Sequence, residues 1–192
     1  PEVLVTLNRI YTRTGDGGDT RLATGQLVRK SSLRVEAYGA VDETNAAIGV
    51  ARLHVGAELD ALLTRVQNDL FDLGADLATP ERADLAYTPL RVVASQVERL
   101  EQEIDRLNAD LSPLTSFVLP AGTPAAAALH VARTVCRRAE RAVVALADAP
   151  GEAVSAEAVQ YVNRLSDLLF VAARWANDRG AADVLWVPAA NR

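Results

Sequence analysis

The chain has 192 residues, 49% of them hydrophobic and 23% charged, a composition that suits a single domain with a sizeable apolar core. Its net charge of −5 argues against a nucleic-acid-binding protein, and its single cysteine and two histidines exclude an intrachain disulfide and a metal centre built on cysteines or several histidines. No apolar run reaches the length of a transmembrane helix and no signal peptide opens the sequence, so we expect a cytoplasmic protein.

Residues 1–33 show no helical periodicity, and residues 3–7 predict either a short strand or a disordered lead. In the stretch that follows, Gly15, Gly17 and Gly18 free the backbone to approach a ligand closely. Hydroxyl and cationic side chains flank these glycines at Thr12, Arg13, Thr14 and Thr20. The loop either binds phosphate through its backbone N–H groups or is an ordinary glycine turn. It is not a P-loop, because the Gly-Lys-Ser/Thr sequence is missing.

The charges near this loop leave its role open. Asp16 and Asp19 would weaken a phosphate site unless a cation balances them. Lys30 is the only lysine of the chain and follows Arg29 in a polar stretch. It either reaches an anion or remains a solvated surface residue.

Three long helices are predicted next, over residues 34–56, 58–78 and 91–111, because apolar residues recur there at spacings of three and four. Asp42 adjoins an apolar seam residue of the first helix, so its carboxylate is either partly buried and in need of a partner or exposed to solvent. The third helix, whose apolar seam begins at Val93, carries a mixed-charge face typical of solvent exposure.

A proline-containing apolar loop follows at residues 112–124. Phe117 and Leu119 in this loop need apolar surroundings. They either close the core or line a ligand pocket.

An arginine-rich helix is predicted over residues 125–146, which are rich in strong helix formers. Its apolar seam consists of Leu129, Ala132, Cys136, Ala139, Val143 and Leu146. Beside the seam, one acid, Glu140, accompanies four arginines within nine positions, Arg133, Arg137, Arg138 and Arg141. Guanidinium groups bind phosphate oxygens through paired hydrogen bonds and stay charged when partly desolvated. The face is therefore either a polyphosphate clamp or a solvated basic surface with Arg–Glu pairs between helices.

The last helix is predicted over residues 156–179, with Ser155 as its N-cap and Gly180 closing it, and residues 184–188 predict an extended tail. Together the seams predict an all-α, five-helix up-and-down bundle. We treat residues 1–192 as one domain made of an N-terminal loop segment, the bundle and a tail (1–33, 34–179 and 180–192).

Five motifs, in order and at matching spacing over residues 9–177, resemble the PduO-type ATP:cob(I)alamin (corrinoid) adenosyltransferase family. They lie at residues 12–18 (Thr-Arg-Thr-Gly-Asp-Gly-Gly), 42–43 (Asp-Glu), 117–120 (Phe-Val-Leu-Pro), 137–141 (Arg-Arg-Ala-Glu-Arg) and 163–167 (Asn-Arg-Leu-Ser-Asp). One position departs from the family pattern, because Ala121 stands where a glycine is usual. This change affects the loop and leaves the ligand-facing residues intact.

The resemblance implies a ferritin-like, adenosyltransferase-type bundle that assembles as a homotrimer with sites between adjacent subunits. ATP would lie under the N-terminal loop of one subunit, which orders on binding, and would contact Thr12, Arg13, Thr14, Gly15, Asp16, Gly18, Thr20, Arg21 and Lys30. The later helices would contribute the nucleotide contacts Arg137, Arg138, Glu140, Arg141 and Asn163. Glu140 would also be a ligand of Mg²⁺ near the phosphates.

The same resemblance implies that Arg133 pairs with Asp42 across the subunit interface. It implies that Phe117 packs beneath the corrin ring and keeps the lower cobalt ligand away. Together with Arg137, these residues are the expected catalytic set.

The implied reaction moves the 5′-deoxyadenosyl group of ATP to the cobalt of cob(I)alamin, giving adenosylcobalamin and triphosphate. The nucleophile is the cobalt, so no Ser, Cys or His base is needed. The protein must instead stabilise charge on the leaving triphosphate with arginines, Lys30, loop N–H groups and Mg²⁺. A cobalamin-dependent mutase and a flavin-dependent reductant are the expected protein partners. A cobalamin carrier without chemistry and a purely structural helical trimer are the alternatives, and the glycine loop together with the arginine helix argues against both.

Overall fold

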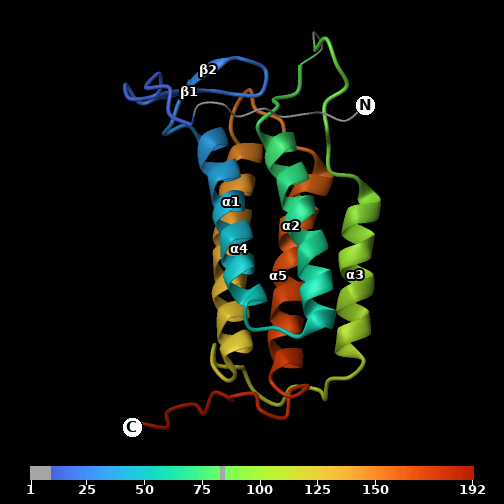
Figure 1. Cartoon of the computed structure of the whole chain (residues 1–192). Coiled ribbons are helices and arrows are strands. Elements are labelled where there is room, and N and C mark those ends of the chain that lie inside the picture. Colours follow the sequence, from blue (N-terminus) through green and yellow to red (C-terminus); the bar gives the residue numbers. More distant parts are fainter. Residues whose placement is uncertain (1–9, 83–84) are drawn as a thin grey trace.

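The computed structural model describes residues 10–82 and 85–192, and the strand or lead predicted at residues 3–7 lies outside them. The described residues form five long helices, α1 Leu33–Arg52, α2 Ala57–Leu77, α3 Ala94–Asn108, α4 Pro124–Ala147 and α5 Ala156–Ala176. Consecutive helices run in opposite directions (Figure 1). α1 packs against α2 and α4, and α5 packs against α4 and α3. The predicted five-helix up-and-down bundle is therefore confirmed.

The apolar seam predicted for α4 forms the centre of the core. All of its members are fully buried, Leu129, Ala132, Cys136, Ala139, Val143 and Leu146. Burial raises the pKa of the Cys136 thiol, whose Sγ lies 3.3 Å from the Val162 carbonyl oxygen. Cys136 therefore packs as a small apolar residue. In the described part of the chain, no helix is long and apolar enough to cross a bilayer.

Four helix ends lie three or four residues inside the predicted bounds, because α1 ends at Arg52, α3 begins at Ala94 and ends at Asn108, and α5 ends at Ala176. α3 begins at Ala94 instead of residue 91, because the preceding residues bind Asp76 of α2. Arg91 Nη1 lies 2.6 Å from Asp76 Oδ1, and the Val92 N–H donates to Asp76 Oδ2 at 2.9 Å. Val93, predicted on the apolar seam, is consequently half exposed. α1 ends before residue 56, in a tight turn that leads into α2.

The ends of α4 and α5 follow local signals that the sequence does show. Thr123 Oγ1 accepts from the Ala126 N–H at 3.1 Å, and Ser155 Oγ accepts from the Ala158 N–H at 3.2 Å. At the other end of α5, the Gly180 N–H donates to the Arg174 carbonyl at 2.9 Å, with a positive φ of 85°.

A small β-hairpin, which the sequence analysis did not predict, projects from the end of the bundle where α1 begins (Figure 1). Its strands are β1 Asp19–Arg21 and β2 Leu27–Arg29, paired antiparallel. Leu22 is buried, and the Ala23 N–H donates to the Ala78 carbonyl of the α2 C-cap at 3.0 Å. The hairpin is thus anchored to the bundle just after β1.

At the opposite end of the bundle, the C-terminal tail runs beside the loop that precedes α4 (Figure 1). Val118 and Leu185 form an isolated antiparallel bridge. The Leu119 N–H donates to the Val184 carbonyl at 2.8 Å, and the Trp186 N–H donates to the Phe117 carbonyl at 2.8 Å. The extended tail predicted at residues 184–188 is therefore one side of a short ladder.

Candidate functional site

The N-terminal loop encloses a cavity of about 620 Å³ whose lining residues all lie between Tyr11 and Lys30. The lining includes most of the predicted loop contacts, Thr12, Arg13, Thr14, Gly15, Asp16, Thr20, Arg21 and Lys30. Gly18 shapes the turn beneath it: its φ is +87°, and a Cβ there would lie 2.7 Å from Arg29 Nη2. A side chain at this position would be strained and would displace Arg29.

Of the two acids that line this cavity, Asp19 has a cationic partner and Asp16 makes no ion pair among the described residues. The Asp19 carboxylate is balanced by Arg29, whose Nη1 lies 2.9 Å from Asp19 Oδ1 and also donates to the Gly17 carbonyl at 2.9 Å. Lys30 Nζ lies over the glycine turn, 3.0 Å from where a Cβ of Gly15 would be. The cation that the sequence could not assign therefore faces the loop.

Arg13 has a backbone conformation that L-residues rarely adopt, with a φ of +62°. Its guanidinium lies 5.5 Å from the ring centroid of Tyr11. Such strain costs free energy and is concentrated at ligand sites in proteins. Asp178, Arg179 and Ala189, which lie outside the predicted site, also have positive φ, so the conformation of Arg13 is compatible with a ligand site and does not identify one.

On α4, three arginines recur every fourth residue and form a single stripe about 12 Å long. Arg137 and Arg141 are exposed, and Arg133 is half-buried. Arg133 Nε donates to His130 Nδ1 at 3.4 Å, and burial together with the charge of Arg137 lowers the pKa of the Arg133 guanidinium. Among the described residues, no carboxylate lies within ion-pair distance of these three arginines.

The other predicted residues of α4 face its two neighbouring helices. Arg138 pairs with Glu43 of α1 and lies 4.0 Å from Glu36 of the same helix. Glu140 faces α5, where Asn163 Nδ2 donates to its Oε1 at 2.8 Å. The predicted nucleotide contacts of α4 therefore occupy different faces of the helix, and Arg138 is already neutralised within the chain.

Ion pairing distinguishes the predicted site from other surfaces. Among the described residues, carboxylates pair with one cation of the predicted site, Arg138, and with arginines outside it, Arg29, Arg34, Arg52, Arg91, Arg99, Arg106, Arg164, Arg174 and Arg179. Within residues 10–82 and 85–192, six cations of the predicted site lack such a partner, Arg13, Arg21, Lys30, Arg133, Arg137 and Arg141. Arg65 and Arg192 also lack a carboxylate partner in the part of the chain that the structure describes. Uncompensated charge is thus gathered where an anion is expected.

Asp42 is exposed, which decides between the two environments left open by the sequence. It lines a hollow of about 440 Å³ between α1 and α2, together with Tyr38, Leu70 and Phe71. Phe71 is 72% exposed, and burial raises the pKa of Tyr38. The sequence analysis missed Phe71, whose only signal is a large aromatic residue beside the apolar seam of α2. In the part of the chain that the structure describes, Asp42 makes no ion pair.

Phe117 lies outside the core, with 77% of its surface exposed. Its ring contacts Trp186, with the two centroids 6.0 Å apart. Leu119 is also exposed, at 40%. The alternative in which these residues close the core is therefore wrong, and an apolar surface at this end of the bundle is available to a ligand.

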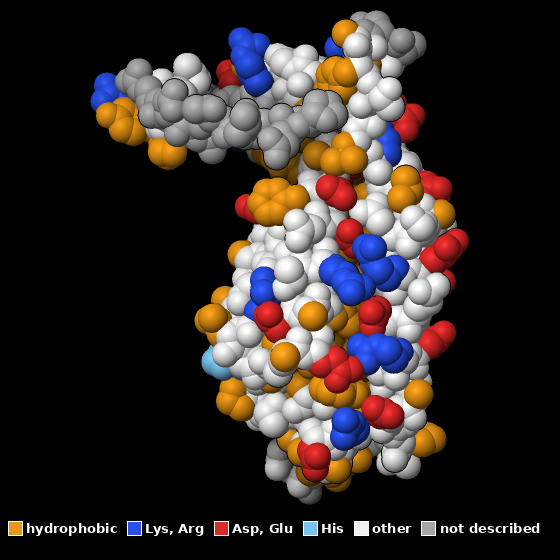
Figure 2. Space-filling model, turned by 45° about the vertical axis from the view of Figure 1, so that its right-hand side comes forward, with side chains coloured by type: hydrophobic (Ala, Val, Ile, Leu, Met, Phe, Trp, Pro, Cys, Tyr) orange, Lys and Arg blue, Asp and Glu red, His pale blue; other side chains and the backbone are white. Residues whose placement is uncertain are grey.

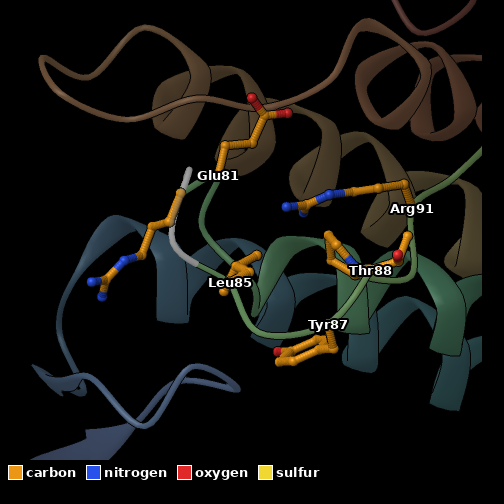
Figure 3. Close-up of a pocket in the computed structure, with 7 residues that line it drawn as sticks. Glu81, Leu85, Tyr87, Thr88 and Arg91 are labelled. Atoms are coloured by element: carbon orange, nitrogen blue, oxygen red, sulfur yellow. The ribbon is translucent and has the colours of Figure 1, made fainter.

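A further cavity, of about 680 Å³, lies in the loop between α2 and α3. Figure 3 shows Glu81, Leu85, Tyr87, Thr88 and Arg91 around it. Arg91 Nη1 holds the end of α2 by donating to the Thr79 carbonyl at 2.7 Å and to Asp76. None of the predicted site residues lines this cavity.

Comparison with known proteins identifies the family of this chain. The sequence profile of the cobalamin adenosyltransferase family matches residues 10–176. The chain belongs to this family. It is 51% identical over 190 residues to the corrinoid adenosyltransferase of Mycobacterium tuberculosis, covering 98% of this chain and 97% of that one. It is 44% identical over 183 residues to the corrinoid adenosyltransferase of Bacillus subtilis, and the match covers 92% of this chain and 91% of that one.

Solved structures of the family share the fold. A variant of the PduO-type ATP:corrinoid adenosyltransferase from Lactobacillus reuteri, complexed with cobalamin and ATP, superposes with a TM-score of 0.86 at 38% identity, covering 94% of this chain and 97% of that one. A second variant of that adenosyltransferase, complexed with ATP, gives a TM-score of 0.82 at 39% identity, covering 93% and 100%.

Within one adenosyltransferase chain, the predicted residues lie along the length of the bundle. The loop cavity lies at the end of the bundle where α1 begins, the segment that precedes α4 lies at the opposite end, and α4 with its arginine stripe runs between them (Figure 1). Phe117 belongs to the segment that precedes α4. The lining of the loop cavity contains no α4 residue. The loop and the stripe therefore do not close around one cavity within a single chain.

Proposed function

We propose that the loop cavity, the α4 arginine stripe and the Phe117 segment form one extended site, completed between adjacent subunits of a homotrimer. As a member of the cobalamin adenosyltransferase family, the protein transfers the 5′-deoxyadenosyl group of ATP to the cobalt of cob(I)alamin, giving adenosylcobalamin and triphosphate. The observation that carries the proposed site is the set of six cations without a carboxylate partner.

The triphosphate is proposed to lie between the loop of one subunit and the α4 stripe of its neighbour. Displacement of triphosphate by cobalt places growing negative charge on the leaving phosphate oxygens. Arg137 and Arg141 are exposed and have no carboxylate partner among the described residues, so their guanidinium groups can take up that charge. Arg141 Nη1 also donates to the Arg137 carbonyl at 3.1 Å. Preorganised donors of this kind typically contribute about 2–4 kcal/mol each to lowering a barrier. Lys30 and the loop N–H groups supply the opposite side.

Glu140 is the proposed protein ligand of Mg²⁺ near the phosphates. Asn163 holds it through Oε1, which orients the carboxylate. Mg²⁺ usually keeps several waters and binds through one or two carboxylates together with substrate phosphates. Bound there, Mg²⁺ would neutralise part of the triphosphate charge.

The apolar end of the site is proposed to take the corrin ring. Phe117 would cover its lower face, where an exposed phenyl ring excludes water and the dimethylbenzimidazole base. Removing such a ligand favours Co(I), which has little affinity for an axial donor, and so makes reduction of Co(II) easier. Asp42 and Arg133, which make no ion pair with any residue that the structure describes, are proposed to pair across the interface and align the two subunits.

An assay with ATP, Mg²⁺ and chemically reduced cob(I)alamin tests the function directly. The visible spectrum should change to that of adenosylcobalamin. An unchanged spectrum would instead favour a cobalamin carrier. Sedimentation of the same sample should give the mass of a trimer, and a monomer with full activity would contradict the inter-subunit site. A flavin-dependent reductant and a cobalamin-dependent mutase are the proposed partners, in the cytoplasm.

A further inference from the structure

A buried polar cluster lies where α5 ends, away from the cations of the site. Asn177 is fully buried, and the side chains of Arg174 and Asp183 are 7% and 3% exposed. Arg174 Nε donates to Asp183 Oδ2 at 2.7 Å, and Asn177 Nδ2 donates to Asp183 Oδ1 at 3.3 Å. A buried network with its groups satisfied fixes one arrangement of the chain around it.

The cluster holds the loop that precedes α4. Asn177 Oδ1 accepts from the Thr123 N–H at 2.9 Å, and its Nδ2 donates to the Ala121 carbonyl at 3.1 Å. Gly122 lies against it with a φ of +114°, and a Cβ there would lie 2.1 Å from Asn177 Oδ1. Arg174 Nη2 holds the start of the same loop by donating to the Ser112 carbonyl at 2.9 Å.

The cluster also fixes the C-terminal tail, because Asp183 directly precedes the ladder with the loop. Trp186 makes the closest contacts of that ladder with Phe117. Its N–H donates to the Phe117 carbonyl, its own carbonyl accepts from Ser116 Oγ at 2.6 Å, and its ring contacts the phenyl ring. Phe117 is 77% exposed, so its place depends on these loop and tail contacts and not on core packing.

We propose that Arg174, Asn177 and Asp183 are positioning residues for Phe117, acting through the loop and the tail. The inference rests on the proposed role of Phe117 beneath the corrin. A phenyl ring can exclude a lower ligand only if the backbone that carries it holds its position. The buried cluster supplies that fixed point for a side chain that the core does not hold.

The test is Asp183→Asn, which leaves Arg174 buried without a carboxylate. Adenosylation that starts from cob(II)alamin and a reductant should fall by about 10²-fold, the size expected when a group is misplaced by about 1 Å. Adenosylation of pre-formed cob(I)alamin should change little. The electron paramagnetic resonance spectrum of bound cob(II)alamin with ATP should show a lower ligand that the wild-type protein excludes.

Asp76→Asn is the matched control, because it breaks an Asp–Arg pair whose carboxylate is comparably buried, at the other end of the bundle. It should lower the melting temperature and leave the ratio of the two activities unchanged. Equal losses in both assays for Asp183→Asn, with an unaltered spectrum, would overturn the inference. A wild-type protein that forms no adenosylcobalamin from cob(I)alamin would instead overturn the proposed function.

Two proline variants test the same idea if Asp183→Asn does not fold. Trp186→Pro removes both the N–H that binds the Phe117 carbonyl and the indole ring that contacts the Phe117 ring, whereas Leu185→Pro keeps both of these contacts and the ladder hydrogen bond of Val184. Both changes lie in an exposed tail, so the bundle should remain folded. Trp186→Pro should lose activity from cob(II)alamin selectively, and Leu185→Pro should not. Identical behaviour of the two variants would overturn the inference.

Discussion

Two helical faces of this molecule are rich in arginine and differ in how the charges are used. On the face that contains α3, Arg99, Arg106 and Arg164 each pair with a carboxylate of a neighbouring helix, and positive and negative side chains are interspersed over the surface (Figure 2). On α4, the stripe of Arg133, Arg137 and Arg141 has no such partner among the described residues. The number of arginines on a face therefore does not distinguish a binding surface from a structural one. Whether those arginines have carboxylate partners is more informative.

The largest expected effect comes from breaking the stripe. Arg137→Ala should lower turnover by about 10²–10³-fold, because it removes a charge-assisted contact to the leaving triphosphate. The fold should be intact, since Arg137 is exposed and makes no ion pair within residues 10–82 and 85–192. Steady-state rates and a thermal melt measure the two effects. Activity close to that of the wild type would remove Arg137 from the site.

A smaller effect should show whether Arg133 finds its acid on another subunit. Asp42→Asn and Arg133→Met should each lower activity, and the double variant should cost less than the sum of the single changes. Residues in direct contact typically show coupling of about 0.5–3 kcal/mol. Rates of the four proteins complete the cycle. If the effects of the two single changes on activity were strictly additive, Asp42 and Arg133 would not pair. All three arginines of the α4 stripe would then lack a carboxylate partner on the neighbouring subunit as well.

The N-terminal loop, which carries Arg13 and Arg21, can be compared with the ion-paired helix α3 by amide exchange. Residues 11–21 have few buried contacts, so we expect their amides to exchange quickly without nucleotide. ATP with Mg²⁺ should slow that exchange, because it supplies the missing partner for Arg13 and Arg21. The paired helix α3 should show a smaller change in the same experiment. Equal protection with and without nucleotide would contradict the proposed ATP contacts of the loop.

The smallest effect is expected on the paired face itself. Arg106→Ala removes ion pairs with Glu58 and Glu103 that are partly exposed, and such pairs contribute about 0.2–1 kcal/mol to stability. Adenosyltransferase activity should be unchanged. The melting temperature and the turnover rate are the measurements. A loss of activity as large as that of Arg137→Ala would show that pairing does not separate functional from structural arginines here.

The helices could be predicted from the sequence because the buried apolar residues recur at spacings of three and four. Every residue assigned to the α4 seam, from Leu129 to Leu146, is buried. The start of α3 could not be predicted, because Asp76, distant in sequence, binds the backbone of Val92. The hairpin was missed for a similar reason: its strands have three residues each, too few to show an alternating pattern.

The site was predicted mainly through motifs, and the structure adds what motifs do not contain. Helical spacing placed Arg133, Arg137 and Arg141 together, but only contacts between helices show that Arg138 is neutralised by Glu43. The exposure of Phe117 was also undecidable from sequence, because an apolar residue in a loop fits a core and a pocket equally well. Its surroundings depend on the C-terminal tail, far along the chain.

The neutralisation of Arg138 has a kinetic consequence. With Arg138 paired, the positive charge on this part of α4 is that of Arg133, Arg137 and Arg141, which form a stripe about 12 Å long. The net charge of the chain is −5. Physiological salt screens exposed charges over about 8 Å, so an approaching nucleotide is repelled by the whole molecule at long range and attracted by the stripe only nearby. Added salt weakens both effects. The association rate should therefore depend less steeply on ionic strength than three arginines on a neutral protein would predict.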